Sequence, residues 1–301
     1  FVLPEKVTPE VRASLTENGV RIEDYYQIDS FVRSLGDDVR LLVDPKRITY
    51  RLYAEIPAHC RKVIGVSALT QLKAIKNETE LSNLRTVMAR DGVALTRFFK
   101  WLEEALARGE TYTEHELDIR LNEHRAKGKN FYGDSFATIC GYLGNGAIVH
   151  YHATAEGSAT VRNEGVLLLD SGGQYLDGTT DITRTIALST PCDELRTDYT
   201  LVLKGHIQIA LAQYPEGTRG SQLDILARKA LWDRGLNYGH GTGHGVGYFL
   251  NVHEGPQNIR TEVNPTELEI GMITSNEPGI YRSGKYGIRI ENLVVTELRA
   301  E

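Results

Sequence analysis

Apolar residues recur at helical spacing in four long stretches of the chain, which occur as two pairs. The first pair covers residues 77–106 and 113–127, and the second covers residues 192–214 and 221–235. Asn77 and Thr113 are typical N-cap residues, and Glu80 stands where a capping box needs an acidic side chain. Each pair is followed by a block rich in glycine and short apolar runs, residues 131–188 and 238–297, which predicts strands. This order predicts an α+β fold with two similar α-α-β halves and a curved antiparallel sheet.

The first quarter of the chain has a different pattern. Residues 28–36 predict a helix, and the apolar runs at residues 39–44 and 48–56 predict strands, with Pro45 and Pro57 marking turns or strand ends. We therefore expect part of an α/β domain over residues 1–72 and a second domain over residues 73–301. The opening residues read as though a longer protein had been entered partway, so we expect the chain to be a fragment.

Composition and charge narrow the class of protein. The 301 residues are 41% hydrophobic and 25% charged, which is typical of a soluble globular protein. A net charge of −6 argues against binding to nucleic acid or to an anionic membrane, and no apolar run is long enough to span a bilayer. The three cysteines are few, widely spaced and odd in number, which favours a cytoplasmic location.

Two carboxylates interrupt the first strand block. Asp170 ends the run "VLLL", and Asp181 follows eleven residues later at the start of another strand-like run. The Asp177-Gly178 pair between them is typical of a turn that joins antiparallel strands. Taken alone, an aspartate beside a glycine is most often a turn residue. Across such a strand pair, however, Asp170 and Asp181 would lie close together.

The second strand block repeats this arrangement with glutamates. Glu277 ends one strand, and Glu291 sits in the returning strand, where Arg289 shares its face and Ile288 and Ile290 point to the core. Carboxylates converging in a partly dry site repel each other, by about 4 kcal/mol for a pair about 4 Å apart at an effective dielectric near 20. Cations or protons must relieve that repulsion. Oxygen ligands with imidazoles suit Mn, Co, Fe or Zn. Such metals often bind as two ions that share bridging carboxylates.

Histidines that could complete such a site lie nearby in the sequence. His240, His244 and His253 stand in a glycine-rich stretch, whose glycines let the backbone approach a bound group closely. His150 lies in the first strand block, and its neighbour His152 stays undecided. A single histidine in a glycine-rich loop is usually structural. The hypothesis therefore depends on the whole set of residues.

Four motifs together carry a resemblance to a known family: "DSGGQYLDGTTDITRT", "HGTGHGVGYFLNVHEGP", "NEPGIY" and "GIRIEN". From about residue 73 to the end, the chain resembles the pita-bread (M24-type) metallopeptidases, and among them the cytosolic-type aminopeptidases P. The resemblance implies two divalent metal ions, with Mn(II) as the first choice and Co or Zn as alternatives. Asp170 would bind one ion and His244 and Glu277 the other. Asp181 and Glu291 would bridge both.

The resemblance also implies a reaction and further site residues. The enzyme would remove the first residue from peptides that have proline in second position. His150, His253 and Glu277 would be catalytic. His240, Tyr281 and Arg289 would bind substrate, with Tyr281 and Arg289 also supporting the glutamate ligands. The resemblance further implies a non-catalytic domain before residue 73 and a homodimer.

Two alternatives stay open at this point. A prolidase has the same fold but cleaves only Xaa-Pro dipeptides. A catalytically weak fragment or a binding module of the same fold is the second alternative, although the intact set of ligands argues against it.

Overall fold

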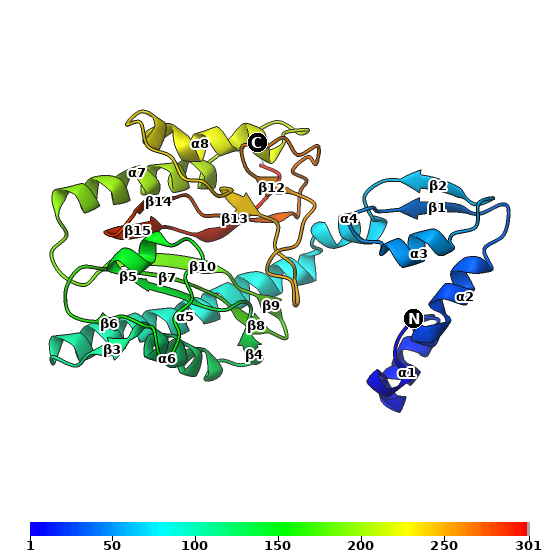
Figure 1. Ribbon diagram of the computed structural model, residues 1–301, viewed down its shortest axis with the longest axis horizontal. Helices are drawn as coiled ribbons and strands as arrows, with labels where there is room; N and C mark the ends of the chain where they lie inside the picture. Colours follow the sequence, from blue (N-terminus) through cyan, green and yellow to red (C-terminus); the bar gives the residue numbers. More distant parts are fainter. Residues whose placement is uncertain (300–301) are drawn as a thin grey trace. The chain divides into compact units, whose positions relative to one another are not determined.

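The computed structural model describes residues 1–299. The chain divides into two compact units, Phe1–Gln71 and Leu72–Glu301 (Figure 1). The last two residues of the predicted second domain, 300 and 301, lie outside the described residues. Among the described helices, none is both long enough and apolar enough to cross a membrane.

The first unit is a small α/β arrangement. Its elements are α1 (Pro9–Glu17), α2 (Ile28–Arg33), β1 (Arg40–Val43), α3 (Tyr50–Glu55) and β2 (Arg61–Ile64), with short 3₁₀ turns at Pro4–Lys6 and Tyr25–Gln27. The predicted helix over residues 28–36 and strand over residues 39–44 are confirmed. The strand predicted over residues 48–56 is wrong, because this segment forms α3.

The topology of the first unit explains that error. β1 and β2 pair in parallel, with Val43 opposite Ile64. Parallel neighbours need a crossover connection, which is usually a helix, and the segment between them is α3. Thr49 caps this helix by accepting a hydrogen bond from the Leu52 backbone N–H. The aromatic and branched residues of this segment favour a strand, but the crossover between the parallel strands favours a helix there.

The four long helices of the second unit are confirmed. They are α5 (Glu78–Ala107), α6 (Glu114–Ala126), α7 (Asp193–Ala210) and α8 (Gly220–Trp232), preceded by α4 (Ala68–Ala74), in which the boundary between the units lies. At the start of α5, Asn77 Oδ1 accepts from the Glu80 N–H at 3.0 Å, and Glu80 Oε2 accepts from the Asn77 N–H at 2.9 Å. Thr113 forms the same capping box in α6. These caps fix where both helices begin.

The strands fall in the two predicted blocks. The first block holds β3 (Tyr112–Thr113), β4 (Phe131–Asp134), β5 (Ile139–Tyr142), β6 (Thr160–Val161), β7 (Val166–Ser171), β8 (Gly173–Tyr175), β9 (Gly178–Thr179) and β10 (Ile182–Ala187), with the 3₁₀ segment η3 (Leu143–Ala147). The second block holds β11 (Gly243–His244), β12 (Asn258–Ile259), β13 (Ile273–Asn276), β14 (Gly279–Arg282), β15 (Tyr286–Arg289) and β16 (Asn292–Val295). Every strand pair described in this unit is antiparallel.

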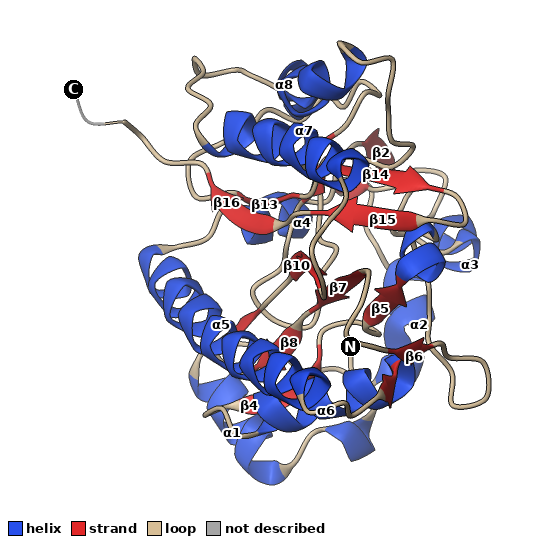
Figure 2. Cartoon of the chain, turned by 90° about the vertical axis from the view of Figure 1, so that its left-hand side faces the viewer, coloured by secondary structure: helices blue, strands red, loops and turns tan. Residues whose placement is uncertain are grey.

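The strands of the second unit lie between the two helix pairs, with α5 and α6 on one side and α7 and α8 on the other (Figure 2). Phe98 of α5 packs with Leu167 and Leu169 of β7 in one core, while Ile288 of β15 packs with Leu231 of α8 in another. The two halves meet where β10 lies against the segment from β15 to β16. At this junction the Glu291 N–H donates to the Thr183 carbonyl at 3.2 Å. This junction brings the carboxylate motifs of both halves together.

Candidate metal centre

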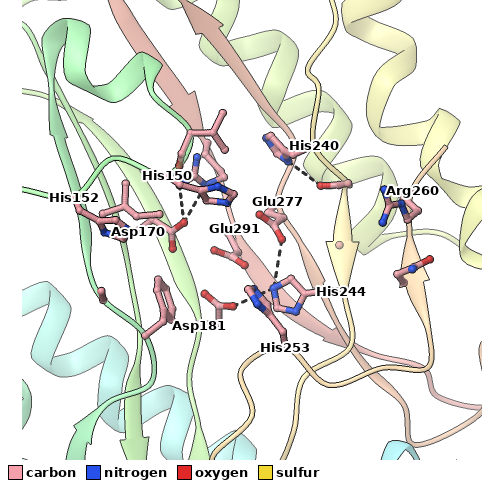
Figure 3. A pocket seen from close by; sticks show the side chains of 18 residues that line it. His150, His152, Asp170, Asp181, His240, His244, His253, Arg260, Glu277 and Glu291 are labelled. Atoms are coloured by element: carbon pink, nitrogen blue, oxygen red, sulfur yellow. Dashed lines mark hydrogen bonds and ion pairs between the residues drawn. The ribbon is translucent and has the colours of Figure 1, made fainter. Parts of the chain in front are cut away.

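A cavity of about 510 Å³ opens in the second unit between its two halves. Its walls carry residues from both strand blocks, and the charged and imidazole side chains gather in its centre (Figure 3). Nine of the ten predicted site residues line it: His150, Asp170, Asp181, His240, His244, His253, Glu277, Arg289 and Glu291. Tyr281 does not line the cavity but contacts two residues that do.

The two aspartates reach the cavity from neighbouring strands. Asp170 is on β7, and Asp181 directly precedes β10; these strands pair antiparallel, with Asp170 opposite Thr183. The turn predicted at Asp177 joins β8 and β9 between them, and Asp177 forms an ion pair with Arg90 outside the cavity. Asp170 and Asp181 are 7% and 3% exposed, so both carboxyls lie in a largely dry setting.

His244 meets carboxylates from both halves. Its Nε2 atom lies 3.3 Å from Asp181 Oδ2 and 3.5 Å from Glu277 Oε1. One ligand atom each from Asp181, His244 and Glu291 lie within 4.8 Å of one another. These three ligand atoms come from segments more than 40 residues apart in the sequence. Their close grouping is the arrangement in which a metal ion can be bound by several side chains at once.

Hydrogen bonds to neighbouring groups orient the ligands. The His244 Nδ1–H donates to the Gly245 carbonyl at 3.0 Å, which leaves the Nε2 lone pair directed at the carboxylates. Ser275 donates to Glu277 Oε1 at 2.9 Å and Thr183 donates to Glu291 Oε2 at 2.7 Å. These contacts are those expected around metal-binding side chains, which are usually fixed by a second partner.

The carboxyl groups of the cavity are not electrostatically balanced by the chain alone. Burial raises the pKa of Asp181, and the neighbouring Asp170 and Glu277 raise it further. Burial also raises the pKa of Glu277 and Glu291. Asp170 Oδ1 is buried and has no hydrogen-bond partner among residues 1–299. A buried carboxylate oxygen without a partner is costly, so this donor set fits divalent cations.

Arg289 contacts the site differently from the prediction. It was expected beside the glutamate ligands, but its Nη2 donates to Asp170 Oδ2 at 2.6 Å and its Nε to the same oxygen at 3.1 Å. Its Nη1 donates to the Tyr281 hydroxyl oxygen at 2.7 Å. The arginine therefore holds Oδ2 of Asp170, whereas the buried Oδ1 has no hydrogen-bond partner among the described residues.

A hydrogen-bonded chain continues from Arg289 to His240. Because Arg289 can only donate, the Tyr281 hydroxyl directs its own proton to His240 Nε2, 2.7 Å away. His240 then holds its proton on Nδ1, which donates to the Gly241 carbonyl at 2.8 Å. Burial lowers the pKa of His240 to about 4 and raises that of Tyr281 to about 12, so both are neutral at pH 7.

Three further histidines line the cavity. The rings of His253 and His244 meet edge to face with centroids 4.2 Å apart. Burial lowers the pKa of His253, and His244 lowers it further, so His253 is neutral and can donate a hydrogen bond. His150 stands on the opposite wall together with His152, whose role the sequence left undecided (Figure 3).

The sequence did not single out several other lining residues. Phe136 and Arg260 also face the cavity, and Arg260 forms an ion pair with Glu262 at 2.7 Å. Neither belongs to a motif that points to chemistry. A phenylalanine after a strand and an arginine in a loop have many ordinary explanations, so only the fold brings them to the site.

The pita-bread fold implied by the motifs is confirmed by solved structures. An X-prolyl aminopeptidase of Caenorhabditis elegans, described as a cytosolic enzyme with a di-nuclear active site, superposes with a TM-score of 0.91 at 38% identity, covering 97% of this chain and 49% of that one. The Xaa-Pro dipeptidase of Bacillus anthracis superposes with a TM-score of 0.78 at 26% identity, covering 94% and 78% of the two chains.

The chain belongs to metallopeptidase family M24, whose sequence profile matches residues 82–297. The profile of the creatinase/prolidase N-terminal domain matches residues 1–80. A probable Xaa-Pro aminopeptidase P of Paracoccidioides brasiliensis is 51% identical over 311 residues, covering 98% of this chain and 50% of the relative. The chain spans half or less of the length of the first curated relatives that it matches.

Proposed function

We propose that this chain carries the catalytic domain of a metal-dependent Xaa-Pro aminopeptidase, which removes the first residue from peptides with proline in second position. The observation that carries the proposal is the convergence of four acidic side chains and His244 on one cavity, where Asp170 Oδ1 has no hydrogen-bond partner among residues 1–299. Relatives named Xaa-Pro aminopeptidase P match nearly the whole chain and support the choice of substrate.

Five residues would hold two divalent ions. Asp170 would bind one ion, His244 and Glu277 the other, and Asp181 and Glu291 both, with Mn(II) as the proposed metal. The di-nuclear site described for the C. elegans enzyme supports the number of ions. Such a pair, when bound, supplies Lewis-acid polarisation of a carbonyl and a nucleophilic water near neutral pH.

The remaining steps fall to side chains of the cavity. A bond to proline is a tertiary amide whose nitrogen has no N–H for an enzyme to bind. His253, which is neutral, would donate a hydrogen bond to the carbonyl oxygen as negative charge develops there. Glu277, whose pKa burial raises, would carry a proton from the attacking water to the departing proline nitrogen.

His150 and His240 would form the walls around proline and the peptide beyond it. The Tyr281 hydroxyl and the Gly241 carbonyl hold both ring nitrogens of His240, so this imidazole can shape the cavity without exchanging protons near pH 7. The proposed location is the cytoplasm, supported by three free cysteines and by the cytosolic C. elegans enzyme. The homodimer stays a prediction.

The experiment compares cleavage of Ala-Pro-Ala and Ala-Pro by chelator-stripped protein with and without Mn(II). Mn(II)-dependent release of alanine from the tripeptide is the expected result. Cleavage of the dipeptide alone would instead favour a prolidase, the second candidate, which the likeness to the B. anthracis dipeptidase supports. Glu277→Ala should abolish both turnover and metal binding. Asp177→Ala, which removes a carboxylate outside the cavity, should leave both intact.

A further inference from the structure

We propose that Glu114 is a positioning residue for the aminopeptidase proposed above: it fixes the loop that carries His150 and His152 in the wall of the cavity. This inference rests on the proposed function. Glu114 is the first residue of α6 and is fully buried. It does not line the cavity and belongs to none of the motifs that indicated the metal site.

The Glu114 carboxylate is surrounded by donors from a single stretch of chain. Glu114 Oε1 accepts from the Tyr142 N–H at 2.6 Å and from Asn145 Nδ2 at 3.0 Å. Glu114 Oε2 accepts from Asn145 Nδ2 at 3.0 Å, the Tyr151 hydroxyl at 2.7 Å and the Ala159 N–H at 2.8 Å. All four donor residues belong to the segment from the end of β5 to the start of β6, so one side chain binds this segment at both ends and in the middle.

The middle contact places the anchor next to the imidazoles. Tyr151 stands between His150 and His152, and both histidines line the cavity (Figure 3). The Tyr151 hydroxyl also accepts from Asn145 Nδ2 at 3.1 Å, which ties it to the same cluster. Because Tyr151 is bonded to Glu114 and is the direct chain neighbour of both histidines, its hydrogen bond restrains the backbone that carries the two imidazoles.

The chemistry of the cluster requires a carboxylate. Every partner of Glu114 donates a proton, and an ionised carboxylate is the side chain that only accepts. Glutamine has the same shape but would turn an NH₂ group toward groups that also donate. These hydrogen bonds and the N-terminal end of α6 stabilise a negative charge on Glu114.

The test uses Glu114→Gln in the full chain loaded with Mn(II). Hydrogen exchange should speed up at the Tyr142 and Ala159 amides, which both donate to Glu114, while the bound Mn(II) stays at the wild-type amount. The kcat/KM for Ala-Pro-Ala should fall by up to about 10²-fold, because a small misplacement of groups at a site can cost that much. Unchanged exchange at both amides would overturn the proposal.

A matched control separates positioning from a general loss of stability. Asp91 is another buried carboxylate, which accepts from Arg125 and Tyr175 and does not touch the loop. Asp91→Asn should lower the melting temperature without accelerating exchange at the Tyr142 amide or lowering kcat/KM to the same extent. An equal loss of kcat/KM in both variants would contradict the positioning role.

A double-mutant test ties the effect to the two histidines. In a His150→Ala/His152→Ala background, Glu114→Gln should cause little further loss of kcat/KM. The same fold-loss in that background would show that Glu114 acts by another route and would refute the proposal. If the wild type cleaves neither peptide, the proposed function fails, and the exchange measurement still decides whether Glu114 holds the loop.

Discussion

Removal of one buried hydroxyl should weaken metal binding although no ligand is touched. Thr183 lies in β10, is fully buried, and donates from Oγ1 to Glu291 Oε2 at 2.7 Å. Thr183→Val keeps the branched shape and removes only this donor. We therefore expect the variant to fold as the wild type does, with a bridging glutamate that is no longer fixed by its neighbour.

The structure sets the size of the effect. A hydrogen bond to a charged group contributes about 1.5–3 kcal/mol, and full burial leaves no water to replace the lost donor. Since about 1.4 kcal/mol corresponds to a tenfold change in an equilibrium constant, the Mn(II) affinity should fall roughly 10- to 150-fold. Partners of metal ligands elsewhere have effects of about 10- to 100-fold, which is the same range.

The assay is a titration of Mn(II) against a competing chelator, with Thr185→Val as the matched control. Thr185 is the next inward-facing threonine of the same strand, but its hydroxyl donates to the Arg289 carbonyl at 3.0 Å and to no ligand. The control should lose stability and keep an affinity close to the wild type. Wild-type affinity in Thr183→Val, or an equal loss in both variants, would refute the reasoning.

Two further predictions concern stability. In metal-free protein, burial raises the pKa of Asp181, Glu277 and Glu291 above their unfolded values; their stabilising contribution is complete below about pH 4 and is lost as the pH rises through the folded pKa values. In urea unfolding, the free energy of unfolding should therefore fall less between pH 5 and pH 8 for Glu291→Gln than for the wild type. An equal fall in both proteins would contradict this prediction. Separately, Arg125→Met should lower the free energy of unfolding by about 3–5 kcal/mol, because it leaves the Asp91 carboxylate in the core without its ion-pair partner. A decrease below about 1 kcal/mol would contradict this prediction.

The elements that the sequence predicted correctly are those determined by interactions between residues a few positions apart in the chain. The capping boxes at Asn77 and Thr113 need only residues three positions apart, so both helix starts were readable in advance. The strand predicted over residues 48–56 failed for the complementary reason. Its helical state depends on the parallel pairing of β1 and β2, which a local pattern does not contain.

The same division applies to the candidate site. The motifs located all five proposed metal ligands, because each motif combines a strand end, glycines and an acidic or imidazole side chain within a few residues. Their roles as ligands stay a prediction. The partners of these residues were not readable: Arg289 pairs with Asp170, 119 residues earlier, and Thr183 bonds Glu291, 108 residues later.

The sequence by itself therefore determined the four long helices of the second unit, the two strand blocks and the residue types that could bind metal. Only the tertiary structure decided which of them meet, which oxygen of Asp170 binds Arg289, and that Glu114 reaches the loop beside His150. The physical reason is the range of the interactions. Caps and periodicity act between residues a few positions apart, whereas a buried cavity forms only when the two halves pack and bring distant charges out of water.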